Sequence, residues 1–298
     1  MHILITGGTG LIGRHLIKAL VGKHDITVLT RNIERASTIL KQNISFVQSL
    51  EELTDFSKFD AIINLAGEPI ADKRWTERQK NKICKSRWQL TQKLVDKIKR
   101  ASSPPEVFIS GSAVGYYGRQ GKHTVTEEQH QVHEEFTHTV CNEWEAIAEQ
   151  AKSKITRVCT IRTGIVLAKG EGALGKMALP FKLGMGGKLG DGEQIMSWIH
   201  IDDEVAAILY LLTNENCEGP YNLTSPHPVS NAEFSKQLAH TLHRPNLFTV
   251  PAFVLKTMLG ETSDLLLTGQ RVLPSRLLSQ GFEFKYQSLD SALDNLYG

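Results

Sequence analysis

The feature that most constrains this 298-residue chain is a glycine-rich turn directly after its first predicted strand. His2–Thr6 is a short apolar run, and Gly7, Gly10 and Gly13 follow it at GxxGxxG spacing before a predicted helix over 11–21. Such glycines permit a tight turn, close approach of the backbone to a pyrophosphate and close packing of helix on strand. The amide groups at the helix N-terminus then face the phosphates. The turn predicts dinucleotide binding; a bare strand–turn–helix connection is the alternative.

The end of the second predicted strand, over 26–30, indicates which dinucleotide is bound. An acidic residue here would accept hydrogen bonds from the adenosine ribose of NAD. This strand instead ends in Thr30 and Arg31, and Arg35 follows one helical turn later. A guanidinium cannot accept those hydrogen bonds, whereas it can bind a 2′-phosphate through paired, charge-assisted contacts. We therefore predict NADP(H) as the cofactor; the alternative is that Arg31 is a solvated loop cation.

Alternating strands and helices predict the fold class. Strands are expected at 2–6, 26–30, 61–65, 107–110 and 156–162, and long helices at 76–99 and 134–151. This alternation forms βαβ units around a parallel sheet, and strands that are apolar throughout have both faces covered. We predict an α/β fold, a Rossmann-type doubly wound parallel sheet with a smaller C-terminal substrate lobe.

The second half of the chain differs from the first in composition and in its predicted elements. Residues 169–192 are rich in glycine, which is typical of loops that close over a ligand rather than of a regular element, and a strand is expected over 194–200. We predict an NADP-binding Rossmann domain at 1–165 and a mainly substrate-binding lobe at 166–298. A segment near 194–224 is expected to return to the first domain.

Composition excludes several classes of protein. The chain is 41% hydrophobic and carries 34 Lys and Arg against 32 Asp and Glu, so it has no global field for binding nucleic acid or a membrane surface. We expect no apolar run long enough for a membrane span and no signal peptide. The four scattered cysteines form no CxxC pair and are expected as free thiols, which favours a reducing cytoplasm.

Four histidines lie close together in the sequence, but they do not predict a metal site. His123, His130, His133 and His138 match no closed zinc spacing and have no accompanying cysteine pair. A solvated loop is the better interpretation, and we expect no metal.

One arginine of a basic helix lies on the face expected to be buried. Residues 73–100 contain eleven Lys or Arg and only two acids, which is usually a solvated face. Arg87, however, falls between Ile83 and Thr91 on the inward stripe. Burying an unpaired guanidinium is costly, so it needs an anionic partner. A cofactor phosphate and a buried Glu are both suitable.

The motifs taken together carry a family likeness over nearly the full chain. Beside the glycine turn, they are Asn64-Leu65-Ala66-Gly67, Ser110-Gly111-Ser112-Ala113, Gly115-Tyr116-Tyr117-Gly118, Trp144-Glu145, Arg162-Thr163-Gly164 and Trp198–Asp203. With them the chain resembles extended short-chain dehydrogenases/reductases of the NAD(P)-dependent epimerase/dehydratase family. The segments Asn64–Ile70 and Lys176–Gly187 are similar to its atypical YfcH-type, or sugar-nucleotide epimerase-like, subgroup.

The resemblance implies a set of cofactor contacts. Those expected at the pyrophosphate are Gly7, Thr9, Gly10, Leu11, Ile12 and Gly13. Thr30 and Arg31 would meet the adenosine end, while Leu65, Ala66 and Gly67 would line the path toward the nicotinamide and Arg87 would face the cofactor. Such positions suit these roles because ligands bind at the carboxyl ends of the strands.

The usual catalytic pair of this family is missing. The resemblance places Ser112 at its serine position, but its Tyr and Lys, spaced YxxxK, have no counterpart, because none of the six tyrosines has a lysine four residues later. On the helix predicted over 134–151, Phe136 is expected at the tyrosine position and Val140 at the lysine position. Neither side chain can exchange a proton.

Another residue must then supply the proton if the protein is an enzyme. Tyr117 lies shortly after Ser112 and is our candidate; the alternative is that it lines the pocket without reacting. We expect His200 and Asp202 to be structural, with Asp202 as a helix N-cap.

Two functions remain open from the sequence. The first is an NADP(H)-dependent oxidoreductase or epimerase-like protein that acts by hydride transfer on a small polar or nucleotide-sugar substrate. The second is a catalytically silent sensor or scaffold that binds NADPH, which the missing YxxxK pair favours. The resemblance also raises a possible homodimer.

Overall fold

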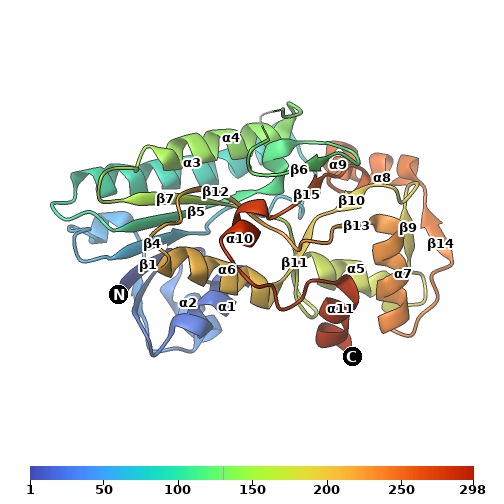
Figure 1. Ribbon diagram of the computed structural model, residues 1–298, viewed down its shortest axis with the longest axis horizontal. Helices are drawn as coiled ribbons and strands as arrows, with labels where there is room; N and C mark the ends of the chain where they lie inside the picture. Colours follow the sequence, from blue (N-terminus) through green and yellow to red (C-terminus); the bar gives the residue numbers. More distant parts are fainter. Residues whose placement is uncertain (130) are drawn as a thin grey trace.

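A computed structural model describes residues 1–129 and 131–298, and a parallel sheet forms its centre (Figure 1). The sheet has seven strands in the order β12-β7-β5-β4-β1-β2-β3, and all neighbouring pairs are parallel. The strands are β1 (His2–Thr6), β2 (Asp25–Leu29), β3 (Ser45–Val47), β4 (Ala61–Asn64), β5 (Val107–Ala113), β7 (Arg157–Thr163) and β12 (Gly219–Leu223). Growth in both directions from β1 is the doubly wound, Rossmann-type arrangement, so the predicted fold class is confirmed.

Helices cover both faces of this sheet (Figure 1). They are α1 (Leu11–Leu20), α2 (Ile33–Leu40) and α6 (Ile201–Thr213) on one face, and α3 (Glu77–Arg100) and α4 (Phe136–Glu149) on the other. Sequence reasoning did not identify α2 or the two edge strands, β3 and β12. Among the described residues, no helix combines the length and apolar character needed to cross a bilayer.

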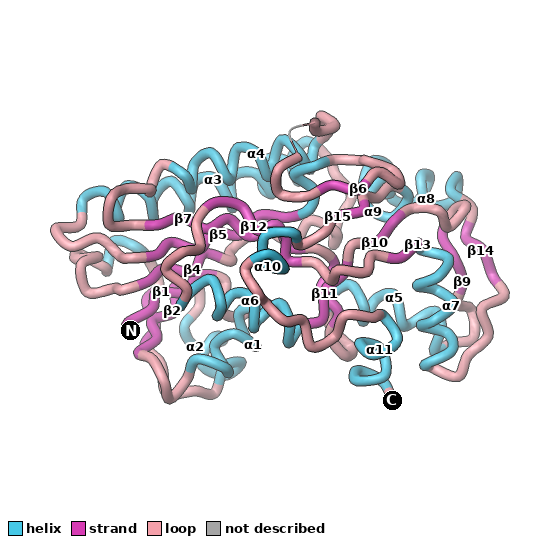
Figure 2. Tube along the Cα trace, in the orientation of Figure 1, coloured by secondary structure: helices cyan, strands magenta, loops and turns pink. Residues whose placement is uncertain are grey.

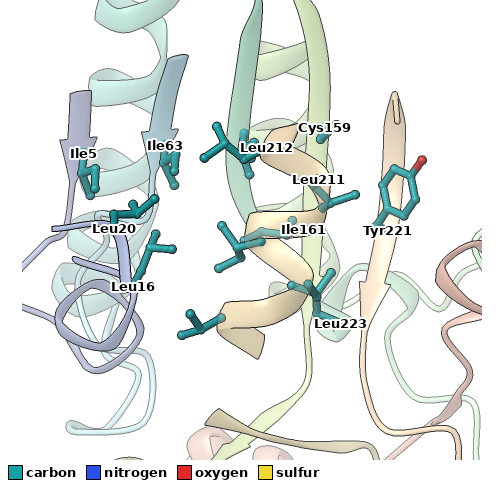
Figure 3. Packing of buried hydrophobic residues seen from close by; sticks show 14 of the residues in the cluster. Ile5, Leu16, Leu20, Ile63, Cys159, Ile161, Leu211, Leu212, Tyr221 and Leu223 are labelled. Carbon is teal, nitrogen blue, oxygen red and sulfur yellow. The ribbon is translucent and has the colours of Figure 1, made fainter. Parts of the chain in front are cut away.

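Side chains alternate between the two faces of each strand and so contribute to two separate hydrophobic cores. In β1, Ile3 and Ile5 join a cluster with α1 and α6, whereas Leu4 joins the cluster under α3. Successive residues of a strand point to opposite faces, which is why an all-apolar strand needs helices on both sides. Figure 3 shows Leu16 and Leu20 of α1 packing toward the sheet. Each fully buried aliphatic side chain of this kind contributes about 1.5–3 kcal/mol.

The rest of the chain forms a lobe of short elements, visible in the tube of Figure 2 as small helices and strands joined by long loops. Its helices are α5 (Gly172–Lys182), α7 (Asn231–Thr241), α8 (Ala252–Leu259), α9 (Asp264–Leu267), α10 (Ser275–Ser279) and α11 (Leu289–Tyr297). Its paired strands are β8 (Ile165–Leu167) with β11 (Trp198–His200), β9 (Gly187–Leu189) with β14 (Phe248–Val250), β10 (Ile195–Met196) with β13 (Val229–Ser230), and β6 (Thr124–Val125) with β15 (Arg271–Val272). Three short 3-10 helices, η1 (Leu50–Glu52), η2 (Val114–Tyr117) and η3 (Gly260–Ser263), complete the fold. A core that includes Trp198, Phe234 and Leu293 holds the lobe together.

Three expectations for this half of the chain were wrong. The glycine-rich stretch 169–192 contains the regular helix α5, because the chain between Gly172 and Lys182 supplies apolar residues that bury against the lobe. The single strand expected over 194–200 is broken at Ser197, whose hydroxyl donates to Gln270 O at 2.7 Å and accepts from Val272 N at 2.9 Å.

The third wrong expectation concerns the start of α6. Its N-cap is His200, whose ring Nδ1 accepts a hydrogen bond from Asp202 N at 3.0 Å. Asp202 therefore lies in the first turn of the helix. There its carboxylate faces the positive end of the helix dipole, a favourable place that does not require it to be the cap.

A close approach of two loops explains why position 7 is glycine. Gly7 has φ of +71°, and a Cβ atom built on it would lie 2.6 Å from the carbonyl carbon of Leu65. The turn after β1 thus packs directly on the backbone that leaves β4. Gly13 closes the same turn from the helix side, since its Cβ would lie 2.4 Å from Gly7 O.

One carboxyl group is buried beneath the end of β7. Glu204, in the first turns of α6, is fully buried, and its Oε1 accepts a hydrogen bond from Thr163 Oγ1 at 2.8 Å. Its Oε2 has no hydrogen-bond partner among the described residues. Burial disfavours the charged form and raises the pKa of Glu204 to about 8, against a smaller opposing effect of the Thr163 hydrogen bond.

We predict that Gly7→Ala destabilises the protein far more than Gly22→Ala. Gly22 has a similar φ of +81°, but a Cβ added to it would meet no atom within 4 Å, so it is a matched control for backbone strain. Gly22→Ala should lower the free energy of unfolding by about 1–2 kcal/mol, and Gly7→Ala by about 1–3 kcal/mol more because of the clash. Urea unfolding measures both; equal losses would contradict the close approach.

We predict a pH dependence of stability from Glu204. The folded state keeps a proton that the unfolded state has lost between the ordinary pKa of Glu and about 8. The free energy of unfolding should therefore fall by roughly 2 kcal/mol or more from about pH 5 to about pH 8. Glu204→Gln should flatten this decline in urea unfolding at both pH values, while Glu215→Gln, at an exposed site just beyond the C-terminal end of α6, should not. Identical slopes for wild type and Glu204→Gln would refute the assignment.

Candidate functional site

The residues predicted to bind the cofactor gather where β1, β2 and β4 end, at the carboxyl edge of the sheet. Most are partly or fully exposed there, including Thr9, Gly10, Leu11, Ile12, Thr30, Arg31, Leu65, Ala66 and Gly67. The first turn of α1 has Gly10 as its N-cap, without a side-chain hydrogen bond and without an acidic residue. Its backbone N–H groups are thus available to an anion, as a pyrophosphate site requires. These features fit a dinucleotide.

A buried chain of hydrogen bonds holds this edge together. Thr6 Oγ1 donates to Asn64 Oδ1 at 2.7 Å and accepts from Ala66 N at 3.2 Å. Asn64 Nδ2 donates to Thr91 Oγ1 at 2.9 Å, and Trp144 Nε1 donates to the same oxygen at 2.9 Å. Because these residues come from β1, β4, α3 and α4, the chain fixes both loops against the two helices.

Arg87 lies beside the loop after β4, as the inward stripe of α3 predicts. Its NH1 donates to Glu68 O at 3.0 Å and to Ile83 O at 3.1 Å, and its guanidinium carbon lies 5.2 Å from the ring centre of Trp144. The carboxylate of Glu68 pairs with Lys82 instead. Within the described part of the chain, Arg87 has no carboxylate partner, so the buried Glu considered as an alternative is absent. Burial lowers the pKa of Arg87, as expected for a cation held mainly by carbonyl oxygens.

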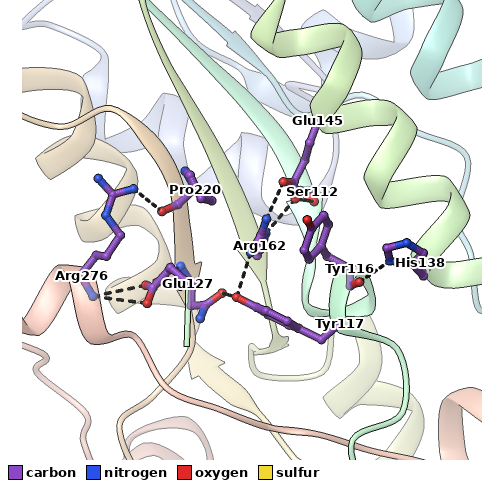
Figure 4. Close-up of polar contacts among 10 residues, drawn as sticks. Ser112, Tyr116, Tyr117, Glu127, His138, Glu145, Arg162, Pro220 and Arg276 are labelled. Carbon is purple, nitrogen blue, oxygen red and sulfur yellow. Dashed lines mark hydrogen bonds and ion pairs between the residues drawn. The ribbon is translucent and has the colours of Figure 1, made fainter. Parts of the chain in front are cut away.

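Ser112 is joined to an ion pair that sequence reasoning missed (Figure 4). Its Oγ donates to Glu145 Oε1 at 2.6 Å. Arg162 donates to both oxygens of Glu145, from Nε at 2.9 Å and from NH2 at 2.8 Å. The side chains of Arg162 and Glu145 are 4% and 12% exposed, so the pair is shielded from water. Burial opposes the charge of Arg162, but the Glu145 carboxylate outweighs it and raises the pKa of Arg162.

Tyr117 supports this ion pair from the other side (Figure 4). Its hydroxyl accepts from Arg162 NH1 at 3.0 Å and donates to Asn222 Oδ1 at 2.7 Å. The side chain is 0% exposed, and burial raises the pKa of Tyr117 to about 12. In this conformation its hydroxyl has no exposed surface with which to meet a substrate. The guanidinium carbon of Arg162 lies over the ring of the partly exposed neighbour Tyr116, 3.5 Å from the ring centre.

The register expected for α4 was wrong by one residue. Phe136 and Val140 belong to an apolar cluster with α3, and the Phe136 ring packs on Trp75 at 4.8 Å between ring centres. The α4 residues that face the Ser112 strand and its loop include Thr137, Cys141 and Glu145, spaced four apart. A Cβ on Gly115 would lie 3.0 Å from Thr137 Cβ and 3.7 Å from Cys141 Sγ. Neither register supplies a Tyr–Lys pair, so the absence of YxxxK stands.

The second lobe reaches the glycine turn through one ion pair that the sequence did not signal. Glu171, the N-cap of α5, pairs with Arg14 of α1, and Arg14 Nε also donates to Gly10 O at 3.3 Å. Close by, a Cβ on Gly172 would lie 2.9 Å from Leu11 Cδ2. Sequence reasoning missed Arg14 and Glu171 because ion pairs between distant segments leave no local pattern.

The histidines near residue 130 do not assemble a metal site in the described residues, where no group of three or more His, Cys, Asp or Glu is placed to hold an ion. His130 lies outside the residues that the structure describes. His138 Nδ1 lies 2.5 Å from Tyr116 O and is thereby tied to the loop after β5. His200 stacks on Tyr286 with ring centres 3.9 Å apart, a packing role away from Ser112.

The sequence matches described families and relatives over most of its length. The model of the NAD dependent epimerase/dehydratase family matches residues 3–224, and that of a domain of unknown function (DUF1731) matches 250–296. The epimerase family protein SAR0825 of Staphylococcus aureus is 38% identical over 295 residues, covering 98% of each chain. SH2119 of Staphylococcus haemolyticus, also called an epimerase family protein, is 40% identical over 299 residues, covering 99% of this chain and 98% of its own.

Solved structures show the same architecture. Human epimerase family protein SDR39U1 (isoform 2), solved with NADPH, has a TM-score of 0.91 at 31% identity and covers 100% of this chain and 99% of its own. UDP-glucuronic acid 4-epimerase from Bacillus cereus, solved with UDP-glucuronic acid and NAD, has a TM-score of 0.79 at 16% identity, covering 100% and 98%; it shares the fold. With its glycine turn, parallel sheet and matching relatives, the chain belongs to the NAD-dependent epimerase/dehydratase family.

Proposed function

We propose that this protein is an NADP(H)-dependent oxidoreductase or epimerase-like enzyme that transfers hydride to or from a small polar or nucleotide-sugar substrate. The observation that carries the proposal is the uncapped first turn of α1, placed at the carboxyl edge of the sheet beside the exposed Gly10. When bound, the dinucleotide supplies the hydride chemistry. The protein contributes binding, orientation and proton transfer.

The choice of NADP(H) over NAD(H) rests on Arg31. This residue is exposed just beyond the end of β2, where an acid would select the unphosphorylated ribose. A guanidinium there pairs with a 2′-phosphate. The NADPH in the SDR39U1 structure, at 31% identity, agrees with this choice.

The other proposed cofactor contacts follow from the geometry of the carboxyl edge of the sheet. We assign Leu65, Ala66 and Gly67 to the path of the cofactor toward the substrate, with Arg87 behind them. The proximity of Arg87 to this loop supports its role, because a Cβ on Gly67 would lie only 2.8 Å from the guanidinium carbon. Arg87 thus orders the loop through its carbonyl contacts and adds positive charge beneath an anionic ligand.

Ser112 is proposed to hold the reacting oxygen of the substrate. It lies at the end of β5, beside the strand that leads into the Leu65 loop. We propose residues 1–165 as the NADP-binding domain, with a segment near 194–224 returning to it, and 166–298 as the lobe that covers the substrate. The pairing of β12 with β7 and the packing of α6 on α1 support the return of that segment.

A homodimer through α3 and α4 is a further part of the proposal. The outward face of α3 forms a basic groove of about 710 Å³, lined by Lys73, Arg78, Lys82 and Lys85 among others. Next to α4 lies a smaller pocket lined in part by Glu134 and Glu143. Opposite charges on adjacent helices favour pairing with a second copy of the chain.

Four buried free cysteines are consistent with the reducing cytoplasm that we propose as the location of the protein.

The alternative function is a silent NADPH-binding sensor or scaffold. The observation that favours it is the presence of Thr137 and Cys141, rather than Tyr and Lys, on the face of α4 toward Ser112. NADPH binding without turnover of carbonyls, alcohols or nucleotide-sugars would support the sensor. Loss of NADPH binding would overturn both functions.

We predict that Arg31→Asp weakens NADPH binding by about ten- to a hundred-fold, because a charge-assisted contact to the 2′-phosphate is lost. NADH binding should change much less. Isothermal titration calorimetry with each dinucleotide measures the two affinities. Lys23→Asp, an exposed residue beyond α1 with the same change of charge, is the control. Equal losses for NADPH and NADH would contradict the role of Arg31, and no binding by the wild type would overturn the proposed function.

A further inference from the structure

We propose that Glu145 is the proton acceptor of this site, acting through Ser112, and that the substrate group it serves first is an alcohol. The inference rests on the proposed function, because an oxidised dinucleotide must take the hydride. It goes beyond that function because it names the residue that transfers the proton in place of the missing Tyr–Lys pair. It also names the chemical group, an alcohol, on which the reaction starts.

The direction of one hydrogen bond carries the argument. A serine hydroxyl has one hydrogen to donate and two lone pairs with which to accept. Ser112 gives its hydrogen to Glu145 Oε1 at 2.6 Å, a distance typical of a strong O–H···O⁻ bond. The lone pairs alone are left for a ligand, so the complementary substrate group is a donor. An alcohol O–H meets this requirement, and a carbonyl oxygen does not.

The proton transfer that follows is balanced. The alcohol O–H bond breaks, and its proton passes to Ser112 Oγ as the Ser112 hydrogen passes to Glu145 Oε1. The hydrogen on the alcohol carbon would leave with its electron pair for an oxidised nicotinamide bound at this edge, and the carbon would become a carbonyl. Serine ends as it began, and Glu145 ends as a neutral acid. In the reverse direction the neutral Glu145 returns its proton through Ser112. Glu145 can therefore serve both an oxidation and the reduction that follows it, as epimerisation requires.

Arg162 has contacts that remain when Glu145 becomes neutral. While Glu145 is charged, Arg162 holds it with two hydrogen bonds. Tyr117 Oη accepts from Arg162 NH1 at 3.0 Å, and because that hydroxyl gives its own hydrogen to Asn222, its lone pairs face the cation. The Tyr116 ring covers the guanidinium at 3.5 Å. The face of an aromatic ring attracts a cation, so this contact also stabilises the charge of Arg162.

Other titratable groups near Glu145 are less suited to the task. Cys141 lies one turn earlier on α4, and burial raises its pKa to about 12. Tyr117 is fully buried, and Arg162 on β7 and Arg87 on α3 are cations that cannot accept a proton. Ser112, which is 8% exposed, is the hydroxyl that donates a hydrogen bond to Glu145 among the described residues.

Turnover tests the inference. Purified protein is incubated with NADP⁺ and, separately, UDP-glucose, UDP-glucuronic acid, glycerol and 2-propanol, and NADPH absorbance is followed. Ser112→Ala and Glu145→Gln should each lower alcohol oxidation about 100-fold or more. Glu149→Gln, on the exposed face one turn further along α4, should match the wild type.

A measurement without turnover tests the same hydrogen bond. The Ser112 hydroxyl proton, held between two oxygens, should give a downfield proton resonance in the ligand-free protein that is lost in Ser112→Ala and Glu145→Gln. Ser112→Ala leaves the Glu145–Arg162 ion pair intact and is therefore expected to fold. If Glu145→Gln unfolds because Arg162 is left unpaired, Glu145→Gln/Arg162→Gln removes both charges and serves in its place.

The outcomes separate the two levels of proposal. Wild-type oxidation of an alcohol, lost in Ser112→Ala and Glu145→Gln, supports the assignment. Wild-type oxidation that both variants retain overturns it and leaves the proposed function standing. NADPH binding with no oxidation of any substrate overturns it in favour of the sensor. Turnover lost in Tyr117→Phe but retained in Glu145→Gln would transfer the role to Tyr117 and overturn it as well.

Discussion

The hydrogen bonds from Thr6 through Asn64 and Thr91 to Trp144 are the constraint on which the functional edge depends. They are buried, and each crosses from one element to the next, so the loops after β1 and β4 cannot shift without breaking a bond whose partner is shielded from water. Trp144 also packs on Gly111, where a Cβ would lie 2.8 Å from its Cη2. The same side chain thereby ties α4 to α3 and to β5 beside Ser112.

Local sequence signals were sufficient for the five inner strands of the sheet and for the glycine turn. Gly7 and Gly13 are needed for short-range reasons, a positive φ and a close backbone approach, and such needs are visible in spacing alone. Strands such as His2–Thr6 are apolar on both faces, which requires helices on both sides and thus predicts the layered fold. The position of Arg87 on the inward face of α3 was predictable for the same reason, since helical periodicity fixes it.

The chemistry of the site was less predictable because it depends on long-range pairing. Nothing near Glu145 in the sequence shows that it meets Ser112, 33 residues away, and Arg162, 17 residues away. A shift of one residue on α4 exchanged Phe136 and Val140 for Thr137 and Cys141, because both stripes are largely apolar or small and periodicity alone does not rank them. Likewise, His200 became the cap of α6 through its ring nitrogen, an acceptor that composition does not distinguish from the nearby aspartates.

The ion pair between Arg14 and Glu171 has a consequence for how the two halves of the molecule work together. It joins the helix that starts at the glycine turn to the first residue of the α5 region, and the two side chains are 35% and 37% exposed. Dissolved ions reach a pair of this exposure and weaken it. The contribution of this pair to holding the N-terminal end of α5 against α1 should therefore decrease as the ionic strength rises.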